Sequence, residues 1–158
     1  MNEVAESNRE ELKKRYRTTA LIVLGQIFST LFLTATAWFL AAQSENSIAP
    51  QAISALWVLI LVVAVGSFVL RRMLFSWERL KNIALTRGVL GVLGSLQTNS
   101  IVLGSLAVVV AIVGFLLAVL SGNKMETFRA GAIALIVFLL NFPRRSIWEK
   151  ILAGIEKI

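Results

Sequence analysis

The chain alternates between long apolar segments and short polar ones, and the apolar segments have the length of membrane-spanning helices. A helix needs about 20 mostly apolar residues to cross the hydrocarbon core of a bilayer. We predict spans at about 18–42, 52–70, 101–120 and 125–142. The last reaches this length only if Glu126 and Arg129 extend their charged ends to the membrane interface, because only 130–142 lacks charge. The sequence thus predicts an all-α integral membrane protein, a single four-helix transmembrane domain built of two hairpins.

Two further segments, at about 72–87 and 146–158, have the periodicity of amphipathic helices. In the second, Ile147, Ile151 and Ile158 share one face, and Ser146 with Glu149 matches a capping box at the start. A Gly-rich stretch at 88–94 follows the first and indicates a joint or a close packing contact before the third span. We predict that both amphipathic helices lie on the cytoplasmic side, where they anchor to the membrane surface or dock a partner. The first is either a separate interfacial helix or a cytoplasmic extension of the second span.

Small residues form a regular pattern in the third predicted span. They are spaced three, four, three and four residues apart, which places them on one helix face: Gly104, Ala107, Ala111, Gly114 and Ala118. Small side chains let helix backbones approach closely in lipid, where van der Waals contact has to hold helices together. This face is therefore predicted to be a helix-packing or assembly surface. Its partner is a helix of the same chain or one of a neighbouring subunit.

A weak internal repeat divides the chain at half its length. The sequence Ile-Val-Leu-Gly occurs at 22–25 and again at 101–104, and the second and fourth spans both end in two arginines followed by a tryptophan. A tandem duplication explains this, as does independent selection of the same end signal. The six residues concerned are predicted to contact anionic lipid or a partner protein: Arg71, Arg72, Trp77, Arg144, Arg145 and Trp148.

Basic residues are distributed unevenly between the two sides of the predicted membrane. The segment before the first span, the segment at 71–100 and the tail hold 14 of the 16 Lys and Arg residues. Positive charge stays on the cytoplasmic side of membranes. We therefore predict an inner or plasma membrane protein with cytoplasmic N- and C-termini, in which Ser47 and Asn123 are external and Ser7 and Ser95 are internal.

The composition excludes several kinds of chemistry. The 158 residues are 57% hydrophobic and include no Cys, His or Asp, which rules out disulfides, thiolate or imidazole metal sites, and Ser-His-Asp catalysis in this chain. Ion and proton carriers usually place a charged group within the membrane, and no Glu, Lys or Arg lies deep in a predicted span. Gln26 and Asn141 either join helices by hydrogen bonds or bind a ligand. We predict no catalytic activity, cofactor, metal or nucleic-acid partner.

These features favour a non-catalytic multi-span membrane protein that serves as a structural or accessory subunit. Its expected partners are a bilayer with anionic lipid and either further copies of the chain or other membrane subunits. The alternative is an oligomeric channel, a small-solute transporter or a membrane-disrupting effector. Its path would use polar residues of the first span, Gln26, Ser29 and Thr36, although these do not make a continuous polar face.

Overall fold

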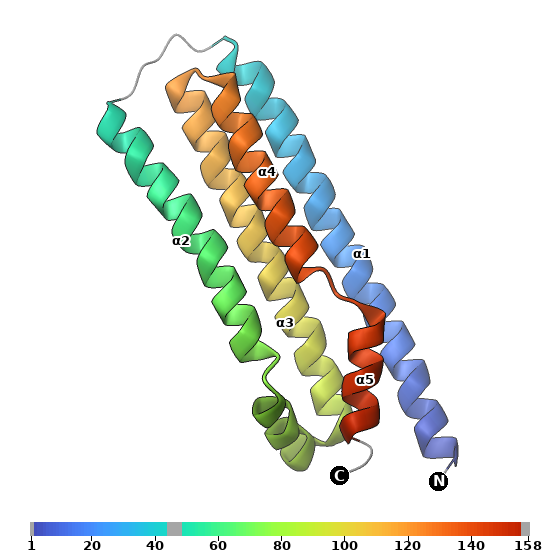
Figure 1. Cartoon of the computed structure of the whole chain (residues 1–158). Helices are drawn as coiled ribbons and strands as arrows, with labels where there is room; N and C mark the ends of the chain where they lie inside the picture. The colour runs from blue at the N-terminus through green and yellow to red at the C-terminus, as the bar shows by residue number, and fades with distance from the viewer. Residues whose placement is uncertain (1, 44–48, 156–158) are drawn as a thin grey trace.

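The computed structural model describes residues 2–43 and 49–155, and these residues form five helices (Figure 1). The helices are α1 (Asn2–Ala41), α2 (Pro50–Leu74), α3 (Trp77–Ser121), α4 (Lys124–Asn141) and α5 (Arg145–Ile155). Over these residues, α1, α2, α3 and the stretch from α4 onward are long and apolar enough to cross a membrane. The all-helical fold with four potential spans is therefore confirmed. Ser47 and Ile158 lie outside the described residues.

Helix α3 is the centre of the bundle. Half of its most apolar stretch is buried, compared with 17% for α1 and 11% for α2. It packs against α1, α2 and α4, which surround it in Figure 1. The small residues of α3 explain this position, because a helix must be narrow on one face to touch several neighbours closely.

The amphipathic helix expected at about 72–87 begins later than predicted, at Trp77, because residues 72–74 belong to α2. Helix α2 starts at Pro50, where a missing N–H costs nothing, and continues through both arginines to Leu74. The chain then breaks, and a new helix begins at Trp77. Asn99 caps the end of α2 at this break, since its Nδ2 donates a hydrogen bond to the Leu74 carbonyl oxygen, 3.2 Å away.

Gly88 divides α3 into two helical pieces. Its φ of 66° and ψ of −171° are not helical, and a positive φ is readily adopted only by glycine. The joint expected in the Gly-rich stretch therefore lies at its first glycine. Beyond it the helix is continuous to Ser121, so the helix that carries the third predicted span begins well before residue 101. In Figure 1 the piece at 77–87 lies apart from the long axis of α3.

Helix α5 begins one residue earlier than expected, and the predicted capping box is wrong. Its first backbone hydrogen bonds run from the N–H groups of Ile147 and Trp148 to the carbonyl oxygen of Arg144, at 3.0 and 3.4 Å. Ser146 is therefore already inside the helix. The Glu149 carboxylate instead accepts a hydrogen bond from Arg145 Nε at 2.7 Å.

A separate hydrophobic core lies at the end of the bundle where α1 begins and α5 folds back (Figure 1). We call it the basal cluster, and it consists of Leu12, Leu80, Val92, Leu93, Leu96, Trp148, Leu152 and Ile155. The cluster joins the first turns of α1, both pieces of α3, and α5. The two segments expected to be surface helices therefore pack on their own chain through their apolar faces.

Candidate functional site

The small-residue face of α3 is covered by helices of the same chain. A Cβ atom added at Gly104 would collide with the Gln26 side chain of α1, and one added at Gly114 would collide with Ala130 Cβ of α4. Ala107, Ala111 and Ala118 on the same face are buried as well. This surface consequently packs the monomer, and its five positions are not open to a neighbouring subunit.

Polar side chains within the spans make hydrogen bonds between helices. Gln26 Nε2 of α1 donates to Ser105 Oγ of α3 at 3.1 Å. Asn141 Nδ2 of α4 donates to Ser67 Oγ of α2 at 3.5 Å. These two contacts agree with the helix-joining interpretation of Gln26 and Asn141. Ser29 is exposed on the outer side of α1 and Thr36 donates to the Phe32 carbonyl of its own helix, so the three polar residues of α1 line no common interior path.

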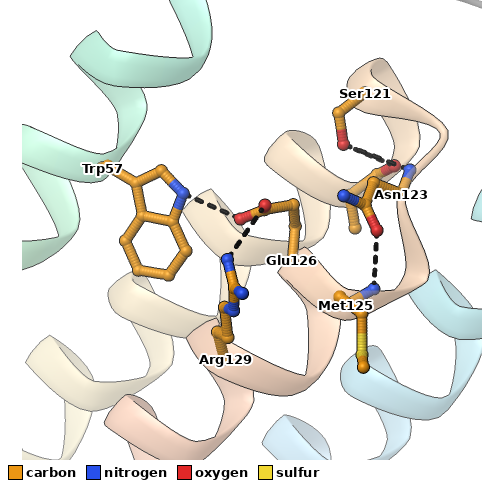
Figure 2. Close-up of polar contacts among 7 residues, drawn as sticks. Trp57, Ser121, Asn123, Met125, Glu126 and Arg129 are labelled. Carbon is orange, nitrogen blue, oxygen red and sulfur yellow. Dashed lines mark hydrogen bonds and ion pairs between the residues drawn. The ribbon is translucent and has the colours of Figure 1, made fainter.

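Glu126 in the first turn of α4 is buried, although we expected it to extend toward the membrane interface. Only 8% of its surface is exposed. Figure 2 shows the indole of Trp57 on α2 pointing at its carboxylate, and Trp57 Nε1 donates to Glu126 Oε2 at 2.8 Å. Arg129 Nη1 lies 3.6 Å from the other carboxylate oxygen. A buried carboxylate needs such partners, and this one links α2 to α4.

The turn between α3 and α4 is built from local capping contacts. Gly122 ends α3 with a φ of 63°, a left-handed cap that glycine adopts without strain. Asn123 is the N-cap of α4, and its Oδ1 accepts a hydrogen bond from the Met125 N–H at 3.0 Å (Figure 2). The Lys124 Nζ atom lies 5.9 Å from the centre of the Trp38 ring, which ties the turn to α1.

Only two of the four arginines predicted to contact lipid or a partner lie together. Arg71 and Arg144 line one cavity of about 230 Å³ between the ends of α2 and α4 and the start of α5. Arg72 is exposed and does not line this cavity. Arg145 points elsewhere and forms the ion pair with Glu149. The sequence brings all four to one end of the bundle, but the fold places only two of them together.

The two tryptophans predicted as lipid or partner contacts differ from each other. Trp77 is 47% exposed and its ring packs against Gly154 of α5. Trp148 is 1% exposed, and its ring meets that of Tyr16 edge to face, with centroids 5.8 Å apart. Trp148 as a lipid contact is therefore wrong, because α5 turns this side chain into the basal cluster rather than toward the membrane surface.

Sequence reasoning missed two residues that position these groups. Trp57 gave no signal because its partner Glu126 is 69 residues away. Asn99 gave a weak signal, since a polar residue beside an apolar span often has a buried partner. It is 5% exposed and its hydrogen bond ends α2 next to the arginine cavity.

The fold and these contacts define an all-helical protein whose four long apolar segments can cross a membrane. The chain matches no protein-family model, no curated protein and no solved structure. Its function has to be argued from its own residues.

Proposed function

We propose that this chain is a non-catalytic subunit that gives structure to a membrane assembly and lies with its basic end in the cytoplasm. The main support is the packed interior of the bundle. The narrow face of α3 is filled by α1 and α4, and Gln26 and Asn141 hydrogen-bond across helices. An interior closed by its own side chains suits a scaffold better than a conducting path.

The outer faces of α1 and α2 support the assembly role. They expose many large apolar side chains, among them Phe28, Phe32, Phe39, Val58, Val62 and Phe68. Such faces suit lipid tails or the helices of a neighbouring subunit. A Cβ atom added to Gly25 on α1 would have no atom of another helix within 4 Å, and Ser29 is exposed one turn later. The proposed assembly contact lies on α1 around Gly25 and Ser29, since the small residues of α3 are occupied within the chain.

The mass of the purified protein in mild detergent tests the assembly role. We expect an oligomer, or a complex with other membrane chains, that Gly25→Leu reduces to the single chain without lowering its thermal stability. Gly66→Leu is the matched control, because Gly66 on α2 is equally open, and it should keep the wild-type mass. A wild-type protein that is always monomeric and co-purifies with no other chain would contradict the proposal.

Ion and solute flux through liposomes tests the absence of a conducting path. The packed interior predicts that liposomes carrying the protein leak no faster than empty ones. Sustained conductance that depends on the protein would contradict the structural role. It would favour the oligomeric channel, the solute transporter or the membrane-disrupting effector.

A further inference from the structure

We propose that the cavity of Arg71 and Arg144, together with the apolar groove between α2 and α4, binds one anionic glycerophospholipid. The lipid phosphate lies between the two arginines and an acyl chain lies along the groove. This inference rests on the membrane placement in the proposed function and is independent of the assembly role.

The arginine cavity has the chemistry of a phosphate site. Two guanidinium groups, one from α2 and one from the connection between α4 and α5, line a cavity of about 230 Å³, and neither forms an ion pair with a side chain that the structure describes. Like charges that share one cavity repel each other unless an anion lies between them. Guanidinium groups bind phosphate through paired, charge-assisted hydrogen bonds. A phosphodiester therefore supplies the countercharge that the described part of the chain does not.

A buried polar side chain in the same cavity also lacks a partner. Asn141 lines the cavity and is 7% exposed, and its Oδ1 accepts no hydrogen bond from any described residue. A buried acceptor without a donor costs free energy. A headgroup that carries hydroxyl groups, such as glycerol, brings the phosphate for the arginines, and it becomes a donor to Asn141 Oδ1 when this buried side chain turns toward the cavity.

The apolar groove gives the site its second half. Its volume is about 310 Å³, and its lining is apolar throughout: Ala64, Val65, Phe68, Ile133, Ile136, Val137 and Leu140. Volume and lining fit part of a hydrocarbon chain.

The groove and the cavity follow one another along the same two helices. On α2, Ala64, Phe68 and Arg71 are spaced four and three residues apart, so they lie on one face. On α4, Leu140 of the groove is followed directly by Asn141 of the cavity. The charged cavity therefore lies at the basic end of the groove. A lipid in the membrane leaflet at the basic end of the bundle has this arrangement, with its phosphate at the membrane surface and its acyl chains toward the middle of the membrane.

Lipid retention by the full chain in a neutral detergent tests the phosphate half, with dioleoyl phosphatidylglycerol as the probe and native mass spectrometry as the readout. We expect one tightly held lipid per chain. The double variant Arg71→Gln/Arg144→Gln should weaken binding about tenfold or more, because it removes charge-assisted hydrogen bonds. The control Arg72→Gln/Arg145→Gln removes the same charge from neighbouring positions outside the cavity and should change binding by no more than about twofold.

A groove variant and a free anion test the acyl half. Val65→Trp fills the groove from an exposed position and should weaken lipid binding. Val62→Trp is the control, since Val62 is almost equally exposed, at 61% against 63%, but does not line the groove. Excess inorganic phosphate should not displace the lipid, because it makes no use of the groove.

Two outcomes would overturn the inference. Equal losses in the two arginine double variants would show a general attraction to surface charge. Displacement by inorganic phosphate together with unchanged binding in Val65→Trp would show a site for free phosphate. Neither outcome depends on the mass or flux of the protein, so a failure of the lipid site and a failure of the assembly role are distinguishable.

Discussion

Gly114 is the residue at which α3 and α4 have no room for a side chain, since an added Cβ would strike Ala130. Gly114→Ile should therefore destabilise the monomer, with a loss of about 1–3 kcal/mol typical of overpacking. Thermal unfolding in detergent measures this. Val109→Ile is the control, because Val109 lies on the same helix and is 41% exposed. A Gly114→Ile protein as stable as wild type would contradict the packing described here.

Glu126 shows what a sequence can and cannot say about single residues. Its position beside an apolar segment correctly indicates that it lies near the end of an apolar helix, in the first turn of α4. The direction of its side chain could not be predicted, because that depends on Trp57, a donor on another helix. Similarly, the spacing of small residues predicted a packing face on α3, but only the fold shows that Gln26 and Ala130 occupy it.

At the scale of elements, α5 is held against the rest of the bundle by Trp148, which is buried in the basal cluster. Trp148→Ala removes a side chain that is 1% exposed, and such truncations typically cost about 3–5 kcal/mol. We expect α5 to detach from the basal cluster, so that limited proteolysis cuts the connection between α4 and α5 at lower protease concentrations. Trp77→Ala is the control with a half-exposed side chain and should have a smaller effect. Equal resistance of the wild type and Trp148→Ala would contradict the docked α5.

The joint in α3 depends on the conformation of Gly88. A side chain at its positive φ is strained by about 1–3 kcal/mol, so Gly88→Ala should lower the thermal stability or straighten the helix and disturb the basal cluster. Gly66→Ala places the same methyl group at an open helical position and should be neutral or stabilising. The midpoints of thermal unfolding compare the two variants. A Gly88→Ala protein as stable as Gly66→Ala would show that the joint needs no positive φ.

The long apolar elements were predictable because a span is recorded locally, in the length and composition of one segment. The ends of these elements were less predictable. The amphipathic patterns at 72–87 and 146–158 correctly indicated apolar faces, but they could not say what covers those faces. Contacts such as Tyr16 with Trp148 join residues far apart in the chain, and they turn expected membrane-surface helices into parts of a protein core.

At the scale of the whole molecule, the fold gathers the basic segments at one end. The first turns of α1, the piece at 77–87 and α5 meet at the basal cluster (Figure 1), and the sequence places most of its Lys and Arg residues in and beside these segments. The turn between α3 and α4 lies at the other end. An orientation with the basal cluster in the cytoplasm therefore agrees with the preference of positive charge for that side.

Labelling of single cysteines in intact cells tests whether the basal cluster lies in the cytoplasm, and the chain has no native cysteine to interfere. We choose Ser7, Asn82 and Asn123, which are all exposed; Ser95 is less suitable because its hydroxyl accepts a hydrogen bond from Asn99. A membrane-impermeant thiol reagent should label Asn123→Cys from outside. Ser7→Cys and Asn82→Cys should react only after the membrane is opened. Labelling of Asn82→Cys in intact cells would contradict the account.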